Sequence, residues 1–98
     1  MVSEELIKMK IETYIKRDGS PYFSWYVGIS ENPEKRLFEE HYVAEDGLWI
    51  YEFAPDSSAA RRIESYFLNV LGTDGGLDKE EIDAKGVYAY KKTDYTSP

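Results

Sequence analysis

The stretch at residues 22–41, YFSWYVGISENPEKRLFEEH, constrains the fold more than any other part of the chain. Its first half alternates between apolar and less apolar side chains, which is the pattern of a half-buried strand. Asn32 and Pro33 then mark the start of a helix, because asparagine is a favoured N-cap and proline suits the first helical turn. A strand that leads directly into a helix predicts a domain of the α/β class.

The composition fits one small folded domain. A chain of 98 residues with 42% hydrophobic and 15% aromatic residues can bury a modest core. The absence of cysteine excludes disulfides, thiol catalysis and Cys-ligated metal sites. No apolar run approaches the length of a membrane span, and the first ten residues lack a signal-peptide core. We therefore expect a cytoplasmic protein with no membrane partner.

The charge balance restricts the partners. The chain carries 12 Lys and Arg residues against 19 Asp and Glu residues, a formal net charge of −7. Domains that bind phosphate backbones are usually basic, so tight binding to duplex DNA by this chain alone is not expected. Nucleic acid would be bound through a local basic patch, and a protein partner is the alternative.

An N-terminal hairpin is predicted from two alternating segments. Residues 6–16 place isoleucines on one side and mostly charged residues on the other, as in a half-buried strand. Residues 17–21 contain Asp-Gly and Pro and predict a turn, and residues 22–29 form the second strand.

The register of this hairpin follows from its apolar faces, which match when Tyr14 lies opposite Tyr26 and Glu12 lies opposite Gly28. Two tyrosines beside an open glycine would then form a small polar platform.

The remaining elements follow from periodicity, caps and punctuating residues. The sheet is predicted to be small and mostly antiparallel, with three or four strands flanked by helices. The predicted elements are a helix at 33–42, a central strand at 48–53, a helix from Asp56 or Ser57 to about Leu71, a glycine-rich loop at 73–76, a short helix at 78–81, an edge strand at 87–92 and a loose tail at 93–98.

A single domain over residues 1–98 is expected. Its core would span residues 6–72, with a short helix and strand at 73–92 and the tail at 93–98.

The order of these residues resembles the GIY-YIG nuclease superfamily over the segment from Tyr14 to Glu64. Tyr26-Val27-Gly28 matches the second half-motif, and Arg36 stands where the family carries a helical arginine. His41 matches a histidine found in part of the family, and Glu64 matches its metal-binding glutamate. The first half-motif departs from the family, since Glu12-Thr13-Tyr14 replaces Gly-Ile-Tyr.

The resemblance implies a metal-dependent phosphodiester hydrolase. A single Mg²⁺ or Mn²⁺ ion would be held by Glu64, and Arg36 would contact the non-bridging phosphate oxygens. Tyr14 would position or deprotonate the attacking water, aided by Tyr26 or His41. The residues expected to bind the substrate are Gly28, Ser30, Lys35, Arg61 and Arg62.

Each candidate also has a purely structural interpretation. Tyr14 and Tyr26 could be an ordinary cross-strand aromatic pair, and Gly28 could simply end its strand. Arg36 could pair with Glu40. By the same reasoning, His41 could pack against Phe38 or lie exposed, Glu64 could pair with Arg61, and the arginines of the second helix could only solvate it.

The predicted function is therefore a weak or degenerate endonuclease acting on DNA or RNA. The alternative is a non-catalytic protein or nucleic-acid interaction module on the same fold, which would display an exposed aromatic patch including Tyr51, Tyr88 and Tyr90. A small acidic protein that inhibits or mimics nucleic-acid partners is a third class, which the net charge of −7 allows.

Overall fold

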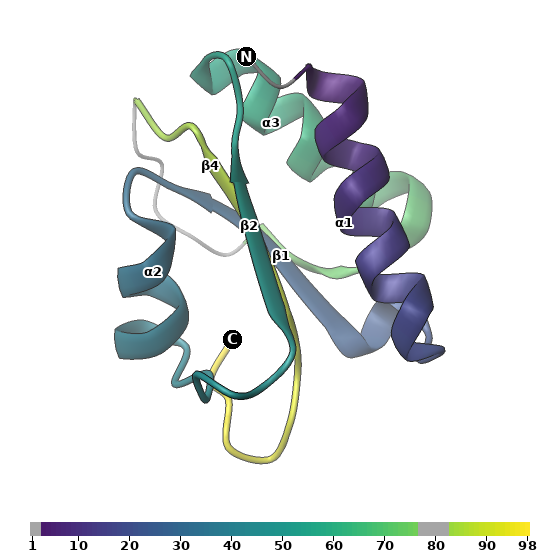
Figure 1. Ribbon diagram of the computed structural model, residues 1–98, viewed down its shortest axis with the longest axis vertical. Coiled ribbons are helices and arrows are strands. Elements are labelled where there is room, and N and C mark those ends of the chain that lie inside the picture. The colour runs from purple at the N-terminus through teal and green to yellow at the C-terminus, as the bar shows by residue number, and fades with distance from the viewer. Residues whose placement is uncertain (1–2, 77–82) are drawn as a thin grey trace.

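The computed structural model describes residues 3–76 and 83–98 (Figure 1). Within these ranges four strands form one sheet in the order β2-β4-β1-β3. Helices α1 (Glu4–Asp18) and α3 (Ser57–Tyr66) cover one face, and α2 (Pro33–Lys35) covers the other. The strands are β1 (Trp25–Ser30), β2 (Trp49–Phe53), β3 (Asp74–Gly75) and β4 (Gly86–Lys91).

Tighter or wider turns extend three of these elements. A 3-10 turn, η1 (Tyr22–Ser24), precedes β1, and π-helical turns η2 (Arg36–Glu40) and η3 (Phe67–Leu71) continue α2 and α3. None of the helices in the described ranges has the length and apolar character needed to cross a bilayer.

The sheet is mixed, whereas a mostly antiparallel sheet was predicted. Strand β4 pairs antiparallel with β1 and β2, but β3 pairs in parallel with β1. This short strand lies in the segment 73–76 that was predicted as a loop. Gly75 permits the pairing, because a Cβ on this residue would lie 2.1 Å from the carbonyl oxygen of Val27.

The predicted strand at residues 6–16 is wrong, and so is the hairpin built on it, because these residues form helix α1. Ile7, Ile11 and Ile15 recur every four residues and are fully buried, which fits one face of a helix. The side chain of Ser3 caps the helix by accepting from Leu6 N at 3.2 Å, and Gly19 ends it with φ 79°. The same isoleucines fit both the alternation of a strand and the four-residue spacing of a helix face, which is why the sequence pattern alone suggested a strand.

The strands predicted at 48–53 and 87–92 are both present, but their places in the sheet are the reverse of those predicted. Strand β4, predicted at an edge, lies between β1 and β2, and its residues Gly86 to Tyr90 are all buried. Strand β2, predicted in the centre, lies at one edge of the sheet, and Phe53 is exposed. Helices cover both faces of this sheet, so even an edge strand can carry a continuous apolar run.

The helices predicted at residues 33–42 and from Asp56 or Ser57 to about Leu71 are confirmed, together with their caps. Asn32 Oδ1 accepts from Lys35 N at 3.2 Å, and Asp56 Oδ1 accepts from Ala59 N at 2.8 Å. Gly72 ends α3 and its extension η3 in the left-handed conformation with φ 84°. The short helix predicted at 78–81 lies outside the described residues.

Residues 93–98 are anchored rather than loose. The backbone N–H of Ser97 donates to the carbonyl of His41 at 2.8 Å, and Thr93 N donates to Thr96 Oγ1 at 2.9 Å. The first bond holds the segment against the residue that follows η2, and the second closes a turn within the segment.

The two faces of the sheet carry different cores. Trp25 and Val27 point toward α1 and α3, where the core is mostly aliphatic. Tyr26 points the opposite way and packs with Leu37 and Val43 under α2 and η2, together with two tyrosines of β4. Successive residues of a strand point to opposite faces, so neighbouring side chains of β1 join different cores.

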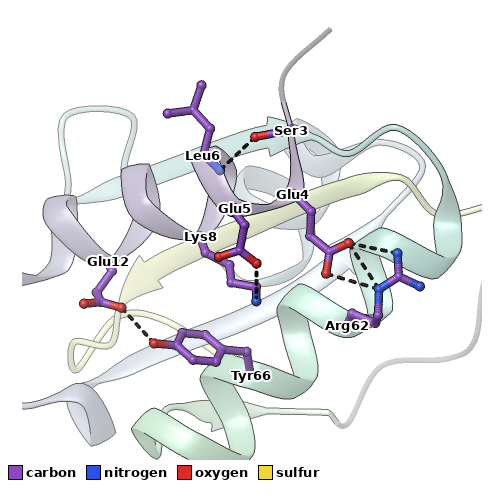
Figure 2. Close-up of polar contacts among 8 residues, drawn as sticks. All are labelled: Ser3, Glu4, Glu5, Leu6, Lys8, Glu12, Arg62 and Tyr66. Carbon is purple, nitrogen blue, oxygen red and sulfur yellow. Dashed lines mark hydrogen bonds and ion pairs between the residues drawn. The ribbon is translucent and has the colours of Figure 1, made fainter.

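Polar contacts join α1 to α3 within their shared layer (Figure 2). The Glu4 carboxylate accepts from Arg62 Nε at 3.1 Å and from Nη2 at 2.8 Å, and the Tyr66 hydroxyl donates to Glu12 at 3.1 Å. The hydrogen bond from Arg62 lowers the pKa of Glu4 below its ordinary value. The clamp therefore contributes stability only while Glu4 is ionised.

Replacement of Ile11 by Ala should lower the free energy of unfolding by about 2–5 kcal/mol, because it opens a cavity in the core. Met9→Ala is the matched control, since Met9 is 62% exposed. We expect that control to change the free energy by no more than about 0.5 kcal/mol in urea titration. A strand would bury both side chains, so equal losses would contradict the helix.

The Glu4–Arg62 clamp predicts a pH dependence of stability. The pKa of Glu4 is lower in the folded than in the unfolded chain, so its contribution is complete above the ordinary glutamate pKa of about 4.3 and is lost as the pH falls through the folded pKa. Glu4→Gln should therefore be less stable than wild type near neutral pH, and the difference should vanish in acid. Urea titrations of both proteins across this range measure it, with Arg62→Gln as the reciprocal variant. A difference that is the same at every pH would contradict the clamp.

Candidate functional site

Four aromatic side chains gather under η2, and we call them the tyrosine–histidine cluster: Tyr26, His41, Tyr88 and Tyr90. The ring of Tyr26 stacks on that of Tyr90 at 5.2 Å and lies 4.7 Å from the His41 ring. All three tyrosines are fully buried and His41 is 4% exposed. The cluster is thus part of the core as well as a group of titratable side chains.

Hydrogen bonds fix the His41 ring. Its Nδ1 lies 2.7 Å from the carbonyl oxygen of Ser97, which can only accept, so Nδ1 carries a proton. Nε2 lies 2.8 Å from the Tyr88 hydroxyl, which donates to it when the ring is neutral. The Tyr90 hydroxyl lies 3.2 Å from Nδ1. His41 is therefore neither exposed nor merely packed against Phe38, and it connects β4 to the C-terminal segment.

A small pocket of about 270 Å³ lies on the same side of the sheet, where β1 leads into α2. We call it the α2 pocket. Asn32 N donates to Ser30 Oγ at 3.0 Å, and Arg36 Nε lies 3.6 Å from Glu40. The Arg36–Glu40 pair considered from the sequence is thus present. The pocket is lined by Ser30, Glu31, Asn32, Lys35, Arg36 and Glu40.

The pocket and the cluster share one sheet face and one helix. Tyr26, Gly28 and Ser30 alternate onto that face, which places Ser30 roughly 13 Å along the strand from Tyr26. Arg36 lines the pocket with its side chain and accepts from His41 N at 2.8 Å with its carbonyl. Ser30, Lys35 and Arg36, which were predicted to contact the substrate, therefore line the same pocket.

Gly86 sets the position of α2 on the sheet. A Cβ on this residue would lie 2.3 Å from Pro33 Cγ and 2.9 Å from the carbonyl oxygen of Ser30. Only glycine lets the first turn of α2 approach β4 this closely. The walls of the α2 pocket depend on this contact.

Tyr14 and Glu64 do not join the cluster. Tyr14 lies on α1, where its ring packs on Trp25 at 5.8 Å and its hydroxyl accepts from Trp49 N at 3.2 Å. Glu64 is half-buried on α3, in the same layer. The sheet separates both from Tyr26 (Figure 1), so the predicted pairing of Tyr14 with Tyr26 is wrong.

The sheet also divides the cations that could have formed a basic patch, which are Lys35, Arg36, Arg61 and Arg62. Arg61 and Arg62 are exposed on α3, and Arg62 is held by Glu4. Lys35 and Arg36 lie on the opposite side of the sheet. The four cations therefore do not form one surface.

Tyr88 and Tyr90 were not identified as site residues from the sequence. Strand β4 pairs antiparallel with β1, with Tyr90 opposite Tyr26 and Tyr88 opposite Gly28. A tyrosine-bearing strand thus does lie beside Tyr-Val-Gly, but it comes from the C-terminal part of the chain. The period-two spacing of the tyrosines in VYAYKK was the available signal.

The oxygen donors that could hold a divalent ion lie in the α2 pocket. Glu31 and Glu40 line it together with the hydroxyl of Ser30 and the amide of Asn32. Mg²⁺ is commonly held by one or two carboxylates while it keeps several waters. No group of three or more His, Asp or Glu side chains in residues 3–76 and 83–98 is arranged as a metal site.

Comparisons of the chain with models of known protein families, with curated protein sequences and with solved structures found no match. The resemblance to the GIY-YIG superfamily therefore stays a prediction.

Gly86→Ala should lower the free energy of unfolding by about 1–3 kcal/mol, because the added methyl group overlaps Pro33. Lys85→Ala is the neighbouring control, and this exposed side chain should matter by no more than about 0.5 kcal/mol. Urea titration measures both variants. Equal stability of Gly86→Ala and wild type would show that α2 does not rest on β4 as described.

Proposed function

We propose that the domain is a weak, metal-dependent phosphodiester hydrolase of the GIY-YIG type, acting on DNA or RNA. The observation that carries the proposal is the placement of Arg36 between a polar pocket and the buried tyrosine–histidine cluster. The residue types are those that the resemblance implies. The residue that would stand beside Tyr26 differs from the one predicted, because Tyr88 and Tyr90 of β4 lie there in place of Tyr14.

The α2 pocket would bind the phosphodiester. Arg36 can present two N–H groups to non-bridging oxygens, and Lys35 adds a second positive charge. The Arg36 side chain is 11% exposed, so its charge acts in a partly dehydrated setting where it stabilises a developing phosphorane more strongly than in water. Binding would require phosphate to displace Glu40 from Arg36.

The cluster would supply the proton acceptor. Tyr88 donates to a neutral His41, so transfer of that proton leaves a phenolate able to take a proton from the attacking water. An isolated phenol has a pKa of about 10 and is mostly protonated at neutral pH, so the neutral imidazole would have to accept its proton before the phenolate could act as a base. Because the cluster is buried, the proposal requires η2 to move when substrate binds.

The α2 pocket is a better candidate site for a divalent ion than the surroundings of Glu64. Glu31 and Glu40 would hold Mg²⁺ or Mn²⁺, and the ion would polarise the phosphate when bound. Glu64 lies on the other side of the sheet from the cluster and the pocket. We therefore move the proposed metal ligand from Glu64 to the pocket.

A non-catalytic interaction module is the second candidate, and the burial of the cluster together with the net charge of −7 favours it. The aromatic patch predicted for such a module is wrong in its composition, because Tyr88 and Tyr90 are fully buried. Tyr51 is half-buried, and its hydroxyl donates to Glu34.

Nicking of supercoiled plasmid and cleavage of structured RNA with Mg²⁺ or Mn²⁺ test the proposal. Arg36→Gln should reduce the rate about 100-fold or more, because it removes the charge that stabilises the transition state. Tyr88→Phe keeps the ring but removes the hydroxyl, and we expect a loss of about 100-fold.

Two variants serve as matched controls, with the fold of each checked by circular dichroism. Tyr14→Phe and Glu64→Gln should cleave like the wild type, since both residues lie in the other layer. Absence of cleavage by the wild type, or cleavage that survives Arg36→Gln, would contradict the proposal and favour the interaction module. Loss of cleavage in Glu64→Gln alone would contradict the reassigned metal site.

A further inference from the structure

The outer edge of β2 carries backbone hydrogen-bonding groups that face away from the sheet. Within the described chain, β2 lies at one end of the sheet order and pairs with β4 alone. Next to the strand, Lys91 N donates to the carbonyl oxygen of Leu48 at 3.0 Å, so residue 48 bonds toward β4. The direction of these groups alternates along an antiparallel strand, so the N–H and carbonyl groups of Trp49, Tyr51 and Phe53 point outward.

Two residues of this edge keep their outward backbone groups free. Trp49 N is satisfied, because it donates to the Tyr14 hydroxyl at 3.2 Å. The outward backbone groups of Tyr51 and Phe53 make no hydrogen bond to another residue in the ranges 3–76 and 83–98. Native sheets often protect such an edge with lysine or proline, and the β2 sequence WIYEF contains neither. The edge is therefore open to pairing with another strand.

Helix α1 turns this edge into a groove. The hydrogen bond from Trp49 N brings Tyr14 of α1 to the outer edge of β2, and Figure 1 shows α1 beside this strand. A pocket of about 350 Å³ lies between the two elements, and we call it the edge groove. An extended segment that pairs with β2 would lie next to α1 in this groove. The groove is lined by Met9, Lys10, Thr13, Tyr14, Arg17 and Ile50.

The charges that line the edge groove favour an acidic ligand. Two of the lining side chains are cations, Lys10 and Arg17, and none of them is a carboxylate. Lys10 lies 3.5 Å from Glu52, whereas the exposed Arg17 forms no ion pair with another residue of the described chain. The groove is thus locally positive on a chain whose net charge is −7. A carboxylate placed there would gain a charge-assisted hydrogen bond from Arg17.

The other face of β2 presents a row of aromatic side chains. The Trp49 and Tyr51 rings stack at 6.0 Å, and the Phe53 ring meets that of Tyr51 edge-on at 5.9 Å. Trp49 and Tyr51 pack with the core under α2, on the opposite side of the sheet from the edge groove. Phe53 is 54% exposed. Apolar or β-branched side chains of an added strand would pack against this row.

We propose that the edge groove binds an extended acidic segment of a partner protein as a further antiparallel strand of the sheet. An Asp or Glu of that segment would lie opposite Ile50, where it meets Arg17; a place opposite Glu52 is disfavoured by like charge. The residue before the acid would exchange two backbone hydrogen bonds with Tyr51, and its side chain would contact the aromatic row. The groove shares no residue with the α2 pocket, so the inference is independent of the proposed hydrolase.

Titration of the isotope-labelled protein with the peptide acetyl-Val-Thr-Val-Glu-Val-amide, followed by NMR, tests the inference. The amide signals of Tyr51 and Phe53 should shift, because their N–H groups gain acceptors. In the proposed register the middle valine bonds to Tyr51, so N-methylation of that valine should weaken binding about tenfold. N-methylation of the glutamate is the matched control, since its N–H points away from β2. An equal or reversed effect of the two methyl groups would overturn the inference.

Variants of the groove test the role of charge. Arg17→Gln should weaken binding of this peptide about tenfold, and Lys85→Gln is the control, because it changes the net charge equally at an exposed residue outside the groove. Arg17→Glu should in turn bind the peptide with lysine in place of glutamate better than wild type does. Absence of shifts at millimolar peptide, or unchanged binding by Arg17→Gln, would contradict the proposed site.

Discussion

The antiparallel pairing of β4 with both β1 and β2 is the interaction on which the rest of the structure depends. Strands β1 and β2 do not touch in the sheet order, so β4 satisfies the inner backbone groups of both. Its residues Gly86 to Tyr90 are all buried. The position of α2, the tyrosine–histidine cluster and the anchored C-terminal segment all rest on this strand.

Alternation along β1 and β4 divides the molecule into two chemically different layers. Trp25, Val27 and Val87 join the aliphatic layer beneath α1 and α3. Tyr26 and Tyr88 join the layer beneath α2, where hydroxyl and imidazole groups hydrogen-bond to one another. Any reactive centre of this domain that includes Tyr26 must therefore be built from the segments on that face of the sheet, among them β1, β4 and residues 33–43, and side chains of α1 or α3 cannot reach it through the sheet.

Local signals in the sequence predicted local structure well. The caps at Asn32, Asp56 and Gly72 predicted the helices that begin at Pro33 and Ser57. Helix α1 was missed because its isoleucines fit both a strand and a helix face. The central place of β4 and the contribution of Tyr88 and Tyr90 depend on pairing between distant segments, which no local pattern encodes.

The central place of β4 also has a consequence for how the domain is made. Contacts between β1 and β4, such as Tyr26 with Tyr90, join segments that are about two thirds of the chain apart in sequence, and such distant contacts make folding slow. During synthesis β1 and β2 leave the ribosome well before β4 does. Until then each has an unpaired edge next to aromatic side chains, which is the arrangement that leads nascent chains to aggregate. The last strand therefore decides when the newly made domain becomes safe from aggregation.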